Sequence, residues 1–181
     1  MGTTALIVID MLSPYAHEDV ELLEKSAERV VPPLARLVRR AHERDDVELI
    51  YVNDNYGDFT ATREDIEDRA RKGRRPDLVE PLLPPPDCAF LPKVRHSAFF
   101  GTPLEYLLAQ RRVENVLLTG QVTEQCVLYT ALDAYVRHYT VRVPRDCVAH
   151  IHPDLAEAAL TMMERNMRAE ITTSSECLDL T

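Results

Sequence analysis

The sequence predicts an α/β protein of three layers, α/β/α, built on a mostly parallel sheet of about six strands with helices on both faces. Short, fully apolar runs alternate along the chain with longer amphipathic segments, which is typical of strands that alternate with helices. The runs are apolar throughout, as expected where a parallel sheet is covered on both faces. A length of 181 residues with 45% apolar content suits one domain, residues 1–181.

The first elements follow from local patterns. Ala5–Ile9 is a continuous apolar run and predicts a strand. An amphipathic segment follows and extends to Arg44, which predicts a long helix. Pro32-Pro33 interrupts this segment, and we expect the pair to kink or split the helix because proline removes a backbone donor. Val47–Val52 predicts the second strand.

The middle of the chain is less regular. Residues 53–86 are charged and rich in proline, and a stretch of this length usually carries function or contains short helices. We expect it to cover an active site or to contribute to a subunit interface. Ala89–Pro92 predicts a strand. Thr102-Pro103-Leu104-Glu105 is a helix start, with threonine as the cap, proline first and glutamate third.

The last third of the chain contains the remaining elements. Val116–Leu118 ends in Thr-Gly and a short polar turn, and Cys126 then opens an amphipathic segment, which indicates a strand, a turn and a helix. Tyr139–Val143 predicts another strand, Pro153–Met167 the last helix and Ala169–Thr172 a final short strand.

Composition excludes several classes of protein. A net charge of −9 argues against a general nucleic-acid binder, which needs a basic surface. No run approaches the ~18 apolar residues of a membrane span, and a strand begins almost at the N-terminus, so we expect no signal peptide. The four cysteines lie far apart without a CxxC pair. Reduced thiols in a cytoplasmic protein are therefore expected.

Three apolar runs end in residues that carry chemistry. Asp10 follows the first strand, Lys93 follows Ala89–Pro92, and Cys126 lies in the first turn of the helix after Val116–Leu118. The carboxyl ends of parallel strands form the ligand-binding edge of such a sheet. A helix N-terminus favours the thiolate of a cysteine and lowers its pKa. An acid, a base and a thiol could support covalent acyl transfer, whereas Cys88, Cys147 and Cys177 lack such a setting and are expected in the core.

The chain resembles the isochorismatase-like cysteine hydrolases. The resemblance runs in order from about Ala5 to Ile171 and implies a Rossmann-like fold in a single hydrolase domain. The matching pieces are Ile7–Met11, Lys93, Ser97–Phe99, Gly101–Leu104, Gly120–Val127, Thr130–Ala134 and Arg145-Asp146.

The resemblance implies roles for these residues. Cys126 would attack a carbonyl carbon, Asp10 would take the thiol proton, and Lys93 would act as their charge partner. The family has a non-proline cis peptide at the position of Gln121–Val122, which aims the amides of Val122 and Cys126 at the developing oxyanion. An acyl-enzyme thioester would then be hydrolysed by water, and no cofactor is needed.

One departure from the family pattern bears on metals. Nicotinamidases of this family carry a metal-binding Asp-x-His after the second strand, whereas this chain has Asp54-Asn55-Tyr56. His150-x-His152 is the only close histidine pair, and a turn or helix-start role suits it better than ligation. We therefore expect no metal and disfavour a nicotinamidase.

Cys126 also bears on the reaction. Isochorismatases proper cleave a vinyl ether with an acid and generally lack this cysteine, so the thiol favours hydrolysis of a C–N bond. Small primary, carbamoyl, ureido or cyclic amides are the expected substrates, and a homodimer or higher oligomer is the expected assembly. The side chains that could line the pocket are Tyr15, Asn55, Tyr56, Phe99, Gln121 and Tyr129.

Three alternatives stay open. A vinyl-ether hydrolase would use Asp10 as an acid and leave Cys126 dispensable. A non-catalytic interaction domain would keep the fold and lose a site residue, but Asp10, Lys93 and Cys126 are all present. A nucleotide-binding α/β protein fits the architecture, although the chain has neither GxGxxG nor GxxxxGK[ST].

Overall fold

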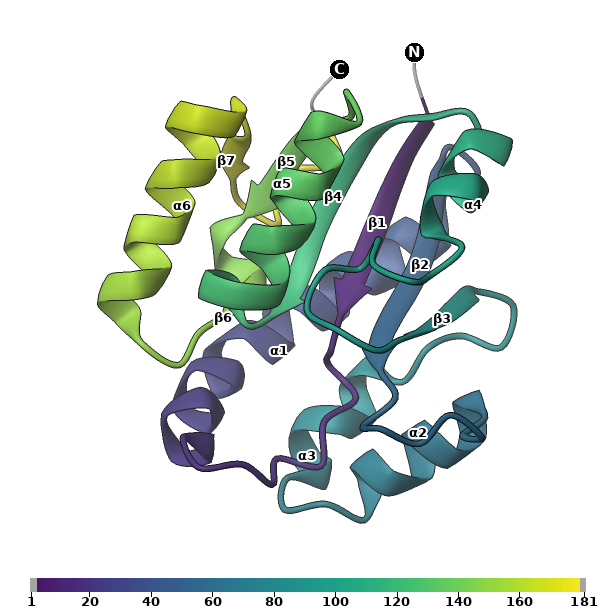
Figure 1. The fold of residues 1–181 in the computed structure, drawn as a ribbon, viewed down its shortest axis with the longest axis vertical. Coiled ribbons are helices and arrows are strands. Elements are labelled where there is room, and N and C mark those ends of the chain that lie inside the picture. Colours follow the sequence, from purple (N-terminus) through teal and green to yellow (C-terminus); the bar gives the residue numbers. More distant parts are fainter. Residues whose placement is uncertain (1–2, 180–181) are drawn as a thin grey trace.

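The computed structural model describes residues 3–179, and seven parallel strands form its central sheet (Figure 1). Six strands lie in the order β3-β2-β1-β4-β5-β7, and the two-residue β6 pairs with β4. The predicted three-layer α/β/α fold is confirmed. The strands are β1 (Thr3–Ile9), β2 (Val47–Asp54), β3 (Ala89–Lys93), β4 (Val113–Gln121), β5 (Thr140–Pro144), β6 (Val148–Ala149) and β7 (Glu170–Thr172).

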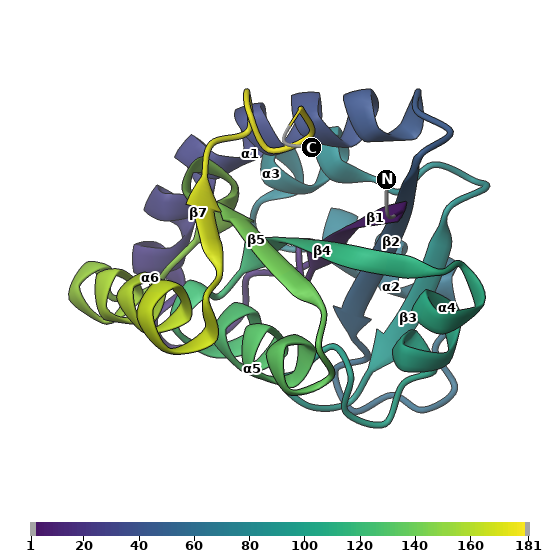
Figure 2. The same cartoon turned by 90° about the horizontal axis from the view of Figure 1, so that it is seen from above.

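Helices cover both faces of this sheet (Figure 2). The helices α1 (Val20–His42) and α3 (Pro76–Val79) lie on one face, and the buried residues of α2 (Arg63–Arg71) join the same core cluster. The other face carries α4 (Leu104–Gln110), α5 (Leu128–Val136) and α6 (Pro153–Met167). The sheet therefore separates two apolar cores.

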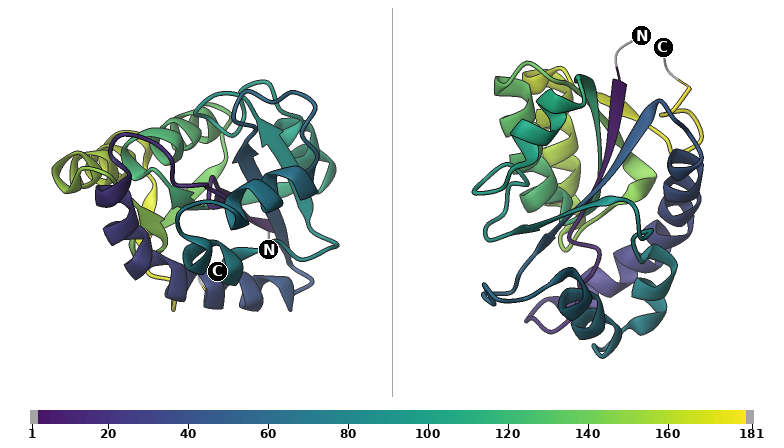
Figure 3. Two further views of the ribbon diagram at one scale, coloured as in Figure 1. Left: turned by 90° about the horizontal axis from the view of Figure 1, so that it is seen from below. Right: turned by 90° about the vertical axis from the view of Figure 1, so that its right-hand side faces the viewer.

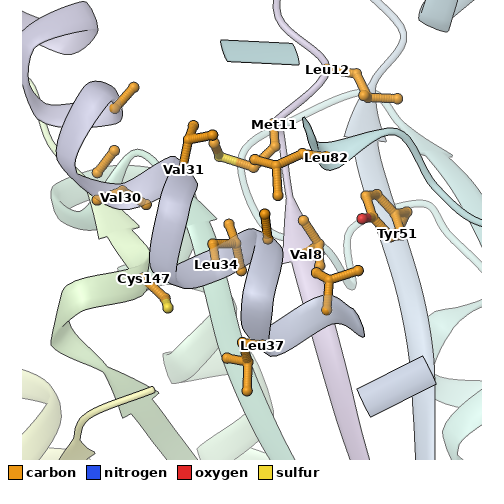
Figure 4. Close-up of a cluster of buried hydrophobic side chains, with 14 of the residues drawn as sticks. Val8, Met11, Leu12, Val30, Val31, Leu34, Leu37, Tyr51, Leu82 and Cys147 are labelled. Atoms are coloured by element: carbon orange, nitrogen blue, oxygen red, sulfur yellow. The ribbon is translucent and has the colours of Figure 1, made fainter. Parts of the chain in front are cut away.

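β1 contributes to both cores because successive side chains of a strand point to opposite faces. Leu6 and Val8 belong to the cluster under α1, where Leu34 and Leu37 also lie (Figure 4). Ala5, Ile7 and Ile9 belong to the cluster under α4, α5 and α6. All five β1 residues are at most 1% exposed, which explains the uninterrupted apolar run.

Of the kink or split expected at Pro32-Pro33, the split does not occur. α1 continues through both prolines for 23 residues. A proline inside a helix costs about 3 kcal/mol, but burying one valine or leucine side chain contributes roughly 1.5–3 kcal/mol. Val30, Val31 and Leu34 flank the prolines and are all buried against the sheet (Figure 4). Packing therefore outweighs the local defect.

The irregular segment after β2 contains short helices, as the sequence allows. α2, α3 and the 3-10 turn η1 (Glu80–Leu82) lie within it, and Figure 3 shows them beside α1. Thr62 caps α2 and exchanges hydrogen bonds with Asp65. No helix of residues 3–179 is long and apolar enough to cross a membrane.

Candidate active site

The structure brings Asp10, Lys93 and Cys126 together at the carboxyl edge of the sheet. Asp10 follows β1, Lys93 ends β3, and Cys126 lies in the turn after β4. The Lys93 Nζ atom is 2.8 Å from Asp10 Oδ2 and 3.8 Å from Cys126 Sγ. One ammonium group therefore contacts both the carboxylate and the thiol.

Gly120 allows the end of β4 to lie this close to β1. It pairs with Ile9 in the sheet and has a φ of 108°, in a region that side chains rarely adopt. A Cβ atom at this position would overlap the Ile9 carbonyl oxygen. Any larger residue would push the two strands apart and move Cys126 away from Asp10.

The turn that carries Cys126 departs from the expected regular helix start. The Gln121–Val122 peptide is cis, as the resemblance implies. A π-helical turn, η2 (Thr123–Val127), follows and leads into α5. The Val122 carbonyl accepts hydrogen bonds from the amides of Gln125 and Val127, at 3.0 and 3.2 Å. Cys126 thus sits in a π-turn ahead of α5.

Buried hydrogen bonds hold Asp10 in place. Its Oδ1 accepts a hydrogen bond of 2.7 Å from the Asp54 amide, and its carbonyl accepts one of 2.7 Å from Gln121 Nε2. Burial raises the pKa of the Asp10 carboxyl, and the charge of Lys93 opposes this shift. A carboxylate with a raised pKa is a better proton acceptor near neutral pH than an ordinary one.

Lys93 is almost completely buried, at 1% exposure. Burial alone would lower the pKa of its ammonium group, but the charges of the groups that face it, Asp10 foremost, outweigh burial and raise that pKa. Asp54 Oδ2 lies 3.8 Å away as a second acidic neighbour. Lys93 therefore remains charged inside the protein and stabilises negative charge on either Asp10 or Cys126.

The expected lowered pKa of Cys126 is wrong. Burial raises the pKa of this thiol to about 12, the negative charge of Asp10 adds to the increase, and Lys93 only partly offsets it. Cys126 therefore rests as a neutral thiol, and Asp10 is the adjacent group that can accept its proton.

Tyr15 and Gln121 contribute to the support of Asp10. Both are buried, and the Tyr15 hydroxyl donates to Gln121 Oε1 at 3.4 Å. Burial raises the pKa of Tyr15 to about 12. Because Gln121 donates in turn to the Asp10 carbonyl, these side chains link the loop after β1 to the end of β4.

Asn55 and Tyr56 lie beside Lys93. The Asn55 amide donates to the Lys93 carbonyl at 2.9 Å, and the Asn55 side chain accepts a hydrogen bond from Gly57. Tyr56 occupies the position of the missing histidine, and its hydroxyl donates to the Leu12 carbonyl at 2.8 Å. Within residues 3–179, no three His, Cys, Asp or Glu side chains gather in a way that could hold a metal ion.

The last two pocket candidates differ in exposure. Phe99 is buried, stacks on Tyr139 and lies under the Arg137 guanidinium. Tyr129 is 41% exposed and packs edge-to-face on His96, with ring centroids 5.5 Å apart. Tyr129 therefore has an exposed surface, and it packs on the His96 ring that contacts the thiol.

His96 and Asp54 also belong to the site, although the sequence patterns did not predict them there. His96 Nδ1 lies 3.9 Å from Cys126 Sγ, and Asp54 contacts both Asp10 and Lys93. Their positions offered a signal, since His96 follows Lys93 by three residues and Asp54 ends the strand between β1 and β3.

Fold and site together define a parallel α/β protein with a thiol, a carboxylate and an ammonium group at the carboxyl edge of its sheet. The profile of the Isochorismatase domain matches residues 4–176. The chain belongs to the isochorismatase family of hydrolases.

Known proteins support this assignment. The chain is 36% identical to the uncharacterized isochorismatase family protein YaaI of Bacillus subtilis, over 97% of this chain and 96% of that protein. Its fold is similar to that of N-carbamoylsarcosine amidase from Thermoplasma acidophilum, with a TM-score of 0.75, 25% identity and coverage of 96% and 98%. The nicotinamidase of Staphylococcus aureus gives a TM-score of 0.73 and 26% identity, with coverage of 95% and 98%.

Proposed function

We propose that this protein is a cysteine amidohydrolase that cleaves a non-peptide C–N bond of a small molecule through an acyl-enzyme on Cys126. The contact of Lys93 Nζ with both Asp10 Oδ2 and Cys126 Sγ, at 2.8 and 3.8 Å, carries this proposal. A nucleophile, a proton acceptor and a fixed positive charge within contact distance are the parts that such a reaction needs.

Acylation follows from the protonation states. The neutral Cys126 thiol gives its proton to Asp10 as the sulfur attacks the carbonyl carbon, and Lys93 stabilises the charge that develops on the sulfur. The carbonyl oxygen becomes an oxyanion. When the tetrahedral intermediate collapses, the C–N bond breaks and the leaving nitrogen takes the proton that Asp10 holds. A thioester on Cys126 remains.

The backbone amides of Val122 and Cys126 would stabilise the oxyanion. Val122 immediately precedes the π-helical turn that contains Cys126 and its sulfur. The oxyanion of a tetrahedral intermediate bound to that sulfur would lie next to this turn. A preorganised donor of this kind contributes on the order of 3 kcal/mol to the reduction of the barrier.

The proposed substrates are small primary, carbamoyl, ureido or cyclic amides. Support comes from the activities for which two similar proteins are named, an N-carbamoylsarcosine amidase and a nicotinamidase. Tyr56 stands where the nicotinamidase pattern requires a histidine, and its hydroxyl is bonded to Leu12. A carbamoyl or ureido compound is therefore a better candidate than nicotinamide, and the reaction would use no metal.

The test combines a substrate screen with two variants. A panel of small amides is assayed for ammonia release and mass change, and each active compound is then tested with Cys126→Ala and Asp10→Asn. We expect Cys126→Ala to lose turnover by at least about 10⁴-fold and Asp10→Asn by about 10²-fold or more. Circular dichroism checks that both variants are folded.

The competing reactions give different results. A vinyl-ether hydrolase would need Asp10 as its acid and would keep near wild-type turnover in the folded Cys126→Ala variant. A non-catalytic domain would turn over no compound of the panel, and its Cys126 would form no acyl adduct. Either result would overturn the proposed function.

A further inference from the structure

His96 is a titratable side chain beside the nucleophile that acylation does not use. Its Nδ1 lies 3.9 Å from Cys126 Sγ, which is about as close as Lys93 Nζ at 3.8 Å. His96 follows β3 in a loop and is exposed, and its ring packs edge-to-face on Tyr129 of α5. The imidazole therefore contacts the sulfur from an exposed loop that is open to solvent.

The sulfur therefore has two different sets of neighbours. Asp10 and the 1% exposed Lys93 form a buried ion pair, whereas His96 and Tyr129 are exposed. The leaving amine departs toward solvent, and water must then enter by the same route to reach the thioester. On that exposed side, the side chain that contacts the Cys126 sulfur is His96.

We propose that His96 is the general base for hydrolysis of the acyl-enzyme, a role that rests on the proposed Cys126 chemistry. His96 Nδ1 takes a proton from water as the water oxygen bonds to the thioester carbon. The tetrahedral intermediate collapses, the C–S bond breaks, and its electron pair leaves on Sγ. The sulfur then takes the proton from His96, and the carboxylic acid is released.

Acylation and hydrolysis of the acyl-enzyme therefore use two different bases. Asp10 receives the thiol proton in acylation and returns it to the leaving nitrogen, so it is again a carboxylate when water arrives. Its Oδ2 is bonded to Lys93 and its Oδ1 to the Asp54 amide, which leaves fewer lone pairs for a water molecule. His96 has its Nδ1 directed at the sulfur, and the aromatic contact with Tyr129 orients the ring.

The experiment uses p-nitrophenyl acetate, which acylates a reactive thiol and needs no knowledge of the natural substrate. Its leaving group departs as an anion, so acylation needs no acid. Stopped-flow absorbance separates the initial burst of p-nitrophenolate from the later steady rate. The wild type is compared with His96→Gln, with the control His17→Gln, which changes an exposed histidine on another loop, and with Cys126→Ala.

We expect His96→Gln to keep the rate and amplitude of the burst while its steady rate falls by about 100-fold or more. Peptide mapping at successive times after the substrate is consumed should show acetyl-Cys126 in both proteins, and in His96→Gln it should disappear correspondingly more slowly than in the wild type. KM should fall together with kcat, leaving kcat/KM unchanged, because acylation is untouched. His17→Gln should match the wild type.

Other outcomes would overturn either the role of His96 or the proposed function itself. A burst slowed as much as the steady rate in His96→Gln would make His96 an acylation base and overturn the proposed role, as would unchanged kinetics in both phases. A burst of equal size in Cys126→Ala, or no acetyl-Cys126 in any variant, would instead overturn the proposed function itself.

Discussion

At the scale of single residues, the site depends on one buried ion pair. Placing a lysine and an aspartate inside a protein costs several kcal/mol per ion before their attraction is counted, so stability alone is a poor reason for the Asp10–Lys93 pair. Its 2.8 Å contact has a clear chemical consequence, because it keeps a carboxylate and a positive charge beside a thiol that burial holds neutral.

The first prediction concerns alkylation of the thiols by iodoacetamide. Cys126 should react first because Asp10 can accept its proton and Lys93 contacts its sulfur, whereas Cys147 and Cys177 are fully buried. Peptide mapping after brief exposure identifies the labelled residue. Labelling of Cys88 or Cys177 ahead of Cys126 would contradict the assignment.

The same reaction should depend on pH in a defined direction. Asp10 accepts a proton only as a carboxylate, and burial raises its pKa. The labelling rate of Cys126 should therefore fall as the pH decreases through this raised pKa, beginning above the ~3.9 of an ordinary aspartate. A rate that stays constant down to about pH 4 would show that Asp10 is not the acceptor.

A second prediction follows from Tyr56. Its hydroxyl is bonded to the Leu12 carbonyl, so this position supplies no imidazole for a metal. Turnover of a substrate found in the amide panel should survive exhaustive dialysis against a chelator. The control is a zinc-dependent hydrolase dialysed in the same way. Loss of activity that zinc or manganese restores would show that a metal takes part.

At the scale of elements, the turn after β4 is tied to the last helix. Glu124 lies in η2, two residues before Cys126, and is buried. Its Oε1 accepts hydrogen bonds from the amides of Ile151 and His152, at 3.0 and 2.8 Å. These donors immediately precede α6, where the helix dipole favours a negative charge. Glu124 therefore connects the turn that carries the thiol to the start of α6.

Glu124→Ala is the third prediction. It leaves two partly buried amides without an acceptor, and each costs about 1–3 kcal/mol, so the free energy of unfolding should fall by roughly 2–6 kcal/mol. Urea denaturation measures the change. The control is Glu157→Ala on the exposed side of α6, where the ion pair with Arg145 contributes at most about 1 kcal/mol. Equal losses in the two variants would contradict the role of Glu124.

At the scale of the whole molecule, the two faces of the sheet present different surfaces. α1, on one face, is amphipathic and exposes a single large apolar side chain, Leu22. α5 and α6 pack against each other on the opposite face and expose several. Contiguous apolar surface is typical of protein interfaces. The exposed large apolar side chains of α5 and α6 are Tyr129, Leu132, Tyr135, Val136, Leu155 and Met162.

The fourth prediction is self-association through α5 and α6. Sedimentation velocity at micromolar concentration should give a mass that is a multiple of the 20.6 kDa chain. Leu132→Glu combined with Val136→Glu should shift the protein toward the monomer, because two charges would be buried without partners. Leu22→Glu on α1 is the matched control and should change nothing. A wild-type protein that sediments as a monomer would refute the prediction.

Much of this architecture is determined locally in the sequence. The apolar run of β1 predicts a strand buried on both faces, and Pro153 with the periodicity after it predicts α6 with its observed bounds. Because parallel strands end at one edge of a sheet, Asp10, Lys93 and Cys126 could be expected to meet before any coordinates were known. Each of these inferences uses only a few neighbouring residues.

Tertiary structure decided what depends on residues far apart in the chain. The buried face of α1 carries the helix through Pro32-Pro33, and burial by distant segments raises the pKa of Cys126 despite the helix that follows it. The path of the loop after β3 places His96 against the sulfur. Desolvation and loop paths are set by long-range packing, whereas strand and helix signals are set by neighbours along the chain.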